Sequence, residues 1–168
     1  MVPKISFFTI STTIAILLPI ISWSSPLKVG DSPQLIASTH AGETFDLSKK
    51  RGKWVIVHFF SSWCPSCKTE LPILDELFKK FHEKKLEMIN LTPERKKNKS
   101  EIEKFINPFH LPYSFIADTK TNDFGEGTLL PSTFLIDPQG HLRKIYVPDG
   151  QPFSEKSIEE EMESSSSF

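Results

Sequence analysis

The sequence predicts an α/β domain with a three-layer α/β/α arrangement around a mixed central sheet. The continuous run of β-branched and aromatic residues at 54–60 indicates a strand that is buried on both faces. Apolar residues then recur at helical spacing, which indicates an amphipathic helix: Leu71, Leu74, Leu77, Phe78 and Phe81. Near the end of the chain, two strand-like runs are separated by a strong turn signal, Asp137-Pro138-Gln139-Gly140.

Composition sets the limits on the class of protein. With 168 residues, 38% hydrophobic and 24% charged, the chain is suited to one globular domain with a substantial core. A net charge of −1 gives no electrostatic support for binding nucleic acid. Two cysteines are too few for a disulfide-stapled scaffold. Structural zinc usually needs four nitrogen or sulfur ligands at fixed spacings, so we predict no metal site.

The N-terminal segment, residues 1–24, has the composition of an export signal. It contains one charged residue, Lys4, followed by a mostly apolar stretch at 5–21 and by small residues at Ser22 and Ser24. The alternative is a retained membrane anchor through residues 5–21, because about 17 apolar residues approach the lower limit for a spanning helix. Both readings predict a periplasmic or extracytoplasmic domain, either soluble after cleavage or anchored to the inner membrane.

Before the central strand, the extended-looking runs 34–37 and 44–47 suggest a β-hairpin around His40-Ala41-Gly42-Glu43. The amphipathic helix that follows the central strand is expected to continue to about Lys84. Residues 86–91 then form the next predicted strand. The first half of the domain therefore reads as a hairpin followed by strand, helix and strand.

In the second half, Ser100-x-x-Glu103 has the pattern of a capping box. It predicts a second helix with an apolar face formed by Ile102, Phe105, Ile106 and Phe109. Residues 113–117 are expected to be a strand or an extended segment, and 132–136 and 142–147 a pair of strands. A short acidic helix is predicted at 157–163, which closes a domain of residues 25–163. Residues 164–168 are predicted to be a disordered tail.

The only two cysteines lie in Trp63-Cys64-Pro65-Ser66-Cys67, after the buried strand and at the start of the predicted helix. The partial positive charge and free N–H groups of a helix N-terminus stabilise a thiolate. Cys64 is therefore the expected nucleophile, and Cys67, one turn inside the helix, the resolving thiol. Pro65 suits a first helical position, and Trp63 should shield one side of the pair. The alternative is a structural disulfide or two inert thiols.

At these residues the chain resembles the thioredoxin superfamily, and more closely its exported TlpA/ResA/DsbE-like branch. The resemblance covers about residues 28–147. Besides the cysteine motif it rests on the strand Gly52-Lys53-Trp54-Val55-Ile56-Val57-His58-Phe59-Phe60, on Cys67-Lys68-Thr69-Glu70-Leu71-Pro72, and on Pro131-Ser132-Thr133-Phe134-Leu135-Ile136-Asp137-Pro138-Gln139-Gly140. It implies a thioredoxin-like fold with an N-terminal β-hairpin extension.

The resemblance also implies roles for individual residues. Pro131 would be the cis-proline that lies opposite the dithiol and presents backbone groups to a substrate, with Leu130 beside the groove. Trp63 and Pro65 would contact the same substrate. In the ResA-like branch a glutamate at the position of Glu70 is associated with thiol proton transfer, and a partly buried carboxylate with a raised pKa suits that task. The alternative is a glutamate that only complements the helix dipole.

His58 is a departure from the family pattern, which has an acidic residue or asparagine at this position. The favoured interpretation is a buried, hydrogen-bonded core histidine. The alternative is a proton relay beneath Cys67.

Three functions follow from the motif. The leading one is an exported thiol–disulfide oxidoreductase that reduces protein disulfides, such as those of apocytochrome c, and receives electrons from a membrane electron donor. The second is a disulfide oxidase or isomerase, and the third is a non-enzymatic Cu(I) carrier that uses Cys64 and Cys67. The predicted redox centre is the Cys64–Cys67 disulfide, without a further cofactor.

Overall fold

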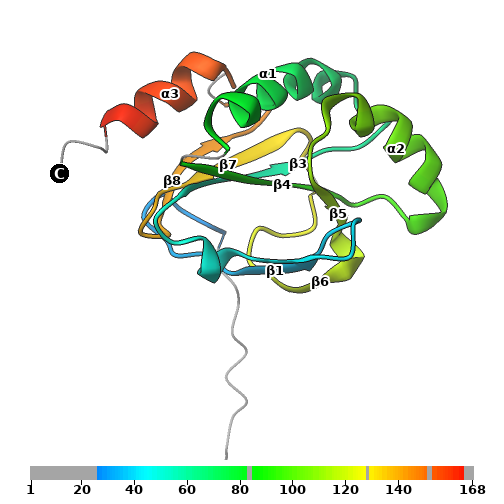
Figure 1. Cartoon of the computed structure of the whole chain (residues 1–168), viewed down its shortest axis with the longest axis horizontal. Helices are drawn as coiled ribbons and strands as arrows, with labels where there is room; N and C mark the ends of the chain where they lie inside the picture. The colour runs from blue at the N-terminus through cyan, green and yellow to red at the C-terminus, as the bar shows by residue number, and fades with distance from the viewer. Residues whose placement is uncertain (1–25, 83–84, 128, 151–152, 165–168) are drawn as a thin grey trace, which may run out of the picture.

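A computed structural model describes residues 26–82, 85–127, 129–150 and 153–164. A five-stranded sheet forms the centre of the domain (Figure 1), in the order β5-β4-β3-β7-β8. Its strands are β3 (Trp54–Phe59), β4 (Leu86–Thr92), β5 (Tyr113–Phe115), β7 (Ser132–Ile136) and β8 (Leu142–Tyr146). The β3–β4 and β4–β5 pairs are parallel, whereas β3–β7 and β7–β8 are antiparallel. The predicted mixed sheet is therefore confirmed, with the fully buried strand β3 at its centre.

The predicted N-terminal hairpin is also confirmed. β1 (Leu35–Ser38) and β2 (Thr44–Asp46) pair in antiparallel fashion, and β6 (Thr119–Asn122) adds a third strand on the other side of β1. The sequence analysis did not anticipate β6. Its residues, Thr-Lys-Thr-Asn, have no apolar alternation, and it is a strand because its backbone pairs with β1.

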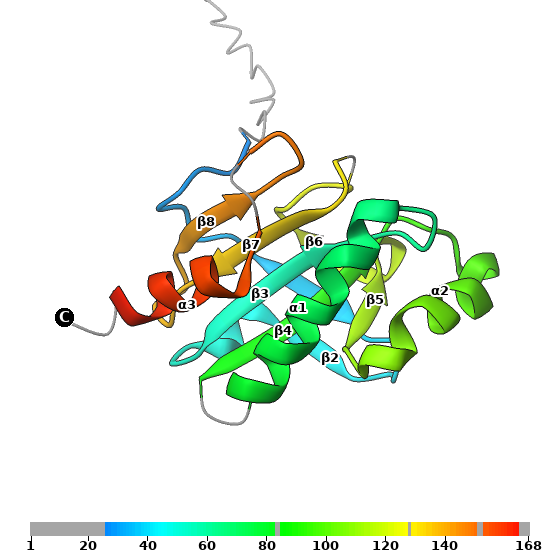
Figure 2. The same cartoon turned by 90° about the horizontal axis from the view of Figure 1, so that it is seen from above.

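Three α-helices pack on one face of the central sheet: α1 (Pro65–Phe81), α2 (Lys99–Ile106) and α3 (Glu155–Ser164). The other face is covered by the β2-β1-β6 sheet, whose apolar side chains share a second core with β3, β4 and β7 (Figures 1 and 2). The thioredoxin-like α/β class is confirmed, but one layer differs from the α/β/α expectation. In the described part of the chain the layer opposite the α-helices is a small sheet and not a helical layer, because β6 extends the N-terminal hairpin to the three strands β2-β1-β6 that cover this face.

Several predicted boundaries need correction. α1 ends at Phe81, three residues before Lys84, and α2 begins at Lys99, so Ser100 lies inside the helix and is not its cap. Short 3-10 turns separate the elements: η1 (Leu47–Lys50), η2 (Lys96–Asn98), η3 (Asn107–Phe109) and η4 (Ile116–Asp118). Ser164, assigned to the tail, is the last residue of α3, which starts at Glu155 and not at residue 157.

The remaining terminal predictions fall outside the described residues. These are the signal peptide or anchor at 1–24 and the tail beyond residue 164. Across the part of the chain that the structure covers, no helix has both the length and the apolar character to span a membrane.

A row of polar side chains crosses the helix-covered face of the central sheet. Strand register aligns His58 with Asn90 on one side and with Thr133 on the other, and these in turn align with Tyr113 and Tyr146. All five are buried. Other positions on this face of the sheet, such as Ile56, Met88 and Leu135, belong to the apolar core. The fold therefore places one polar row under α1, the helix that carries the two cysteines.

Candidate active site

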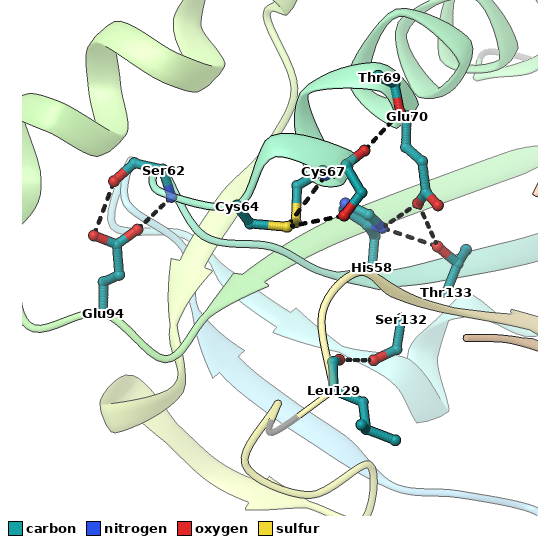
Figure 3. Close-up of a disulfide and its surroundings, with 11 residues drawn as sticks. His58, Ser62, Cys64, Cys67, Thr69, Glu70, Glu94, Leu129, Ser132 and Thr133 are labelled. Carbon is teal, nitrogen blue, oxygen red and sulfur yellow. Dashed lines mark hydrogen bonds and ion pairs between the residues drawn. A yellow bond between two sulfur atoms is a disulfide. The ribbon is translucent and has the colours of Figure 1, made fainter. Parts of the chain in front are cut away.

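The cysteine motif lies where β3 leads into α1. Cys64 is the N-cap residue, and its Sγ accepts a hydrogen bond from the Cys67 N–H at 3.2 Å. Pro65 is the first helical residue, where a missing N–H costs nothing. The two cysteines are joined in a disulfide (Figure 3), with Cys64 4% exposed and Cys67 fully buried. This order of exposure is the one that the sequence predicts for a nucleophile and a resolving thiol.

Trp63 and the loop before β7 lie beside the disulfide. Trp63 is 68% exposed and borders a pocket of about 450 Å³ that also includes Glu94, Asn98 and Phe105. The Leu130–Pro131 peptide is cis, as the family resemblance implies. The loop is closed by a hydrogen bond from the Ser132 hydroxyl to the Leu129 carbonyl.

A second pocket, of about 430 Å³, lies along α1 on the side of Glu70. Its lining combines α1 residues with Pro131 and with the segment after β8: Ser66, Thr69, Glu70, Ile73, Pro131, Tyr146, Val147, Pro148, Gly150 and Phe153. Of the predicted substrate-binding residues, Trp63 and Pro131 therefore line pockets beside the disulfide. Pro65 is exposed at the helix start, and Leu130 is half-buried and packs on both cores.

Glu70 projects from α1 toward the polar row on the sheet (Figure 3). Its carboxylate Oε2 lies 3.5 Å from the Thr133 hydroxyl, which donates to it, and 3.7 Å from His58 Nδ1. Burial raises the pKa of Glu70 to about 7, and the Thr133 hydrogen bond offsets only part of that effect. The structure therefore gives Glu70 the raised pKa that the sequence analysis expected.

His58 lies beneath α1 on β3, and its side chain is fully buried. Its Nδ1 is 2.9 Å from the Thr133 hydroxyl oxygen. Among the described residues its Nε2 has no hydrogen-bond partner. Because burial lowers the pKa of His58 to about 3, the imidazole is neutral at physiological pH. Glu70, Thr133 and His58 thus form one polar group near the resolving cysteine (Figure 3), with Glu70 partly buried and the other two fully buried.

Glu94 is a site residue that the sequence analysis missed. Although it is buried, its carboxylate accepts the Ser62 N–H at 2.5 Å, the Ser62 hydroxyl at 3.0 Å and the Asn98 amide at 3.2 Å. These bonds tie the segment after β4 to the residues directly before Trp63 (Figure 3). In sequence Glu94 stands in a charged stretch typical of a solvated loop, so no local signal distinguishes it.

Metal binding would rest on the cysteine sulfurs themselves. Over the residues that the structure describes, no group of three or more His, Cys, Asp or Glu side chains is placed to hold a metal ion. The chemistry that the geometry supports is thiol–disulfide exchange. A thiol pair at a helix N-terminus lies beside a carboxyl group whose pKa suits proton transfer near neutral pH.

Comparison with known proteins supports this chemistry. The AhpC/TSA family model matches residues 30–145. The thiol–disulfide oxidoreductase ResA of Geobacillus thermodenitrificans is 32% identical over 117 residues, which cover 68% of this chain and 66% of the relative. ResA of Bacillus cereus is 29% identical over 119 residues, covering 69% and 68%. This chain thus spans about two thirds of the length of each.

Solved structures agree on the fold. The crystal structure of a putative thiol:disulfide interchange protein DsbE from Chlorobium tepidum superposes with a TM-score of 0.66 at 20% identity, covering 83% of this chain and 98% of the other. With the family match and the identity to ResA, the conclusion is that this chain belongs to the AhpC/TSA family as a thioredoxin-like thiol–disulfide oxidoreductase.

Proposed function

We propose that the protein is an exported reductant of protein disulfides. It would act in the periplasm or an equivalent extracytoplasmic space, on substrates such as apocytochrome c, and would be recharged by a membrane electron donor. The observation that carries the proposal is the Cys64–Cys67 pair at the start of α1, near the partly buried carboxyl group of Glu70 with its raised pKa. Export is supported by the composition of residues 1–24, a segment that would either be removed as a signal peptide or retained as a membrane anchor.

The reaction consists of two exchange steps. The Cys64 thiolate attacks one sulfur of the substrate disulfide, forms a mixed disulfide, and releases the other substrate sulfur with its electron pair. Cys67 then attacks Cys64 Sγ, which closes the disulfide and frees the first substrate sulfur. Two electrons pass to the substrate, and the dithiol of the membrane donor restores the reduced pair. Glu70 receives the proton that Cys67 must lose before it attacks.

The charges near the sulfurs support this direction of electron flow. Strong oxidants of this type owe their potential to a stabilised thiolate in the reduced form. Here Pro65 and Ser66 supply no cation between the cysteines, and the buried His58 imidazole is neutral because burial lowers its pKa to about 3. Glu70 brings a group that is either neutral or negative. Such surroundings favour the disulfide over the thiolate, and hence a reductant.

The reduction potential of the purified protein tests the direction. We expect a value near roughly −270 mV, the range of thioredoxin, and a value above about −180 mV would assign the protein to disulfide formation or isomerisation instead.

Trapping in the native compartment tests the mechanism. Cys67→Ala should accumulate mixed disulfides with cysteine substrates, because the attack that resolves them is lost. The matched variant Cys64→Ala should accumulate few, since Cys67 is fully buried. Equal trapping by both variants, or none by Cys67→Ala, would reject Cys64 as the nucleophile.

A further inference from the structure

The Nε2 atom of His58 is a buried polar atom that the exchange reaction does not yet use. The ring is fully buried, and within the described residues Nε2 has no partner, whereas Nδ1 is 2.9 Å from Thr133. Leaving such an atom unpaired is unfavourable, so a fold that keeps one calls for an explanation. Figure 3 shows the imidazole beneath the helix end that carries Cys67, with Thr133 and Glu70 on its other side.

The Thr133 hydroxyl connects the two titratable groups. When Glu70 is ionised, Thr133 donates to Oε2 at 3.5 Å, and its oxygen accepts the proton of His58 Nδ1. Nε2 is then a bare acceptor. When Glu70 is protonated, its O–H can donate to Thr133, which turns its own hydroxyl proton toward Nδ1, and the imidazole proton then resides on Nε2. The protonation of Glu70 and the tautomer of His58 are therefore coupled.

We propose that His58 and Thr133 form a proton relay between the Cys67 thiol and the Glu70 carboxylate, in which the imidazole changes tautomer without becoming charged. The relay deepens the proposed exchange reaction and rests on it. In the relay the unpaired Nε2 of His58 accepts a hydrogen bond from the Cys67 S–H. This thiol is present only after the Cys64–Cys67 disulfide has been reduced.

The proton balance of the relay is closed. In the mixed disulfide, the Cys67 proton moves to His58 Nε2, the Nδ1 proton moves to Thr133, and the Thr133 hydroxyl proton moves to the Glu70 carboxylate. The Cys67 thiolate then attacks Cys64 Sγ, and the substrate sulfur leaves with its electron pair and takes a proton from water. Thr133 and His58 end neutral, and Glu70 holds the proton until solvent removes it. No co-reactant beyond the mixed disulfide is needed.

The surroundings of His58 contain few competing proton acceptors. From α1, Glu70 Oε2 lies 3.7 Å from its Nδ1, and Figure 3 shows Cys67 above the ring, while its neighbours in the polar row, Asn90 on β4 and Thr133 on β7, are neutral. The phenols Tyr113 on β5 and Tyr146 on β8 lie one strand further out, and burial raises the pKa of both. Glu70 is thus the group among the described neighbours of His58 that is suited to take the Cys67 proton at neutral pH.

Two-phase reduction of an aromatic disulfide with a coloured thiolate tests the relay. Attack by Cys64 releases the first coloured thiolate and attack by Cys67 the second, so the second phase isolates the step in question. In the wild type its rate should rise with pH through about 7, the pKa of Glu70. Thr133→Val and His58→Asn should slow it at neutral pH by at least about tenfold and abolish that inflection.

Three matched variants make the result specific. Thr133→Ser keeps the hydroxyl and should restore the inflection, while Tyr113→Phe removes a buried phenol elsewhere in the row and should leave it in place. If Glu70→Gln removes the inflection while Thr133→Val and His58→Asn keep it, Glu70 acts directly on Cys67 and the relay is wrong. If the reduced wild type releases no colour in either phase, the proposed exchange function fails instead.

A measurement on the unmodified protein avoids any effect of substitution on folding. Nitrogen NMR of the oxidised wild type should find the His58 proton on Nε2 below the Glu70 pKa and on Nδ1 above it. An imidazole that keeps one tautomer on both sides of that pKa would overturn the proposal.

Discussion

Glu70 and Glu94 are two shielded carboxylates on opposite sides of the same disulfide (Figure 3), and they differ in how many donors reach them. Glu94 accepts three hydrogen bonds of 2.5–3.2 Å from Ser62 and Asn98. Glu70 receives one donor, at 3.5 Å, and lies 3.7 Å from an imidazole that stays neutral. Glu94, with three donors, holds the loop after β4 against Ser62. Glu70, with a single distant donor, has a raised pKa and can exchange a proton near pH 7. Burial alone does not assign a role, but the number of donors does.

The largest expected difference between the two sites is in stability. Glu94→Gln should lower the free energy of unfolding of the oxidised protein by about 3 kcal/mol, because its amide N–H₂ cannot accept the Ser62 hydroxyl and the Asn98 amide, the two donors that bond to Oε2. Glu70→Gln should raise it by about 2 kcal/mol at neutral pH, since a neutral amide replaces a carboxyl group whose ionisation is disfavoured by burial. Denaturant unfolding measures both. Equal losses in the two variants would remove the distinction.

The pH dependence of stability sharpens the comparison on the Glu70 side. Its folded pKa of about 7 exceeds the ordinary 4.5, so it contributes stability at low pH that is lost as pH rises through about 7. His58 does the opposite. Its folded pKa of about 3 lies below the ordinary 6.5, so its contribution is complete above 6.5 and is lost as pH falls toward 3.

Between pH 4.5 and 6.5 these two contributions oppose each other, and the stability of the wild type should be nearly flat. Glu70→Gln removes one of them, so over that interval the variant should lose about 2 kcal/mol as pH falls. Unfolding midpoints measured across the interval decide the matter. A variant as flat as the wild type would show that the two groups are not perturbed in opposite directions.

The smallest effect is expected at Ser62. Ser62→Ala should destabilise the protein by about 1 kcal/mol, because the hydroxyl bond to Glu94 is lost while the backbone N–H bond remains. Ser66→Ala is the matched control, an exposed serine in the cysteine motif whose hydroxyl lies 3.6 Å from Cys64 Sγ. It should change stability by less than about 0.5 kcal/mol. If Ser66→Ala lowered the free energy of unfolding as much as Ser62→Ala, the hydrogen bond from the Ser62 hydroxyl to Glu94 would not account for the loss.

What the sequence could predict was local. The apolar run of β3, the helical spacing of α1 and the position of Cys64 at the helix start depend on neighbouring residues, and the structure bears them out. For Glu70, the family resemblance implied a raised pKa, with a glutamate that only complements the helix dipole as the alternative. β6 and Glu94 could not be predicted, because Thr119–Asn122 is a strand only through β1, and Glu94 meets Ser62 across 32 residues of chain.

The covering of the second sheet face shows the same limit. The α/β/α expectation put a helical layer there, but β6 pairs with β1 of the N-terminal hairpin instead. That pairing depends on β1 and not on the residues of β6 itself. The polar row through His58 is likewise a property of strand register. His58 stood out in the sequence, but the other members of the row did not, and only the pairing of five strands brings them into line.

The most direct test is the pKa of the Glu70 carboxyl group itself, measured by carbon NMR on the oxidised protein. The account predicts a titration midpoint of about 7, caused by burial with too few hydrogen-bond donors. A midpoint at the ordinary value of 4.5 would contradict it. Glu70 would then be an ordinary carboxylate of α1, without the raised pKa on which its proposed proton transfer depends.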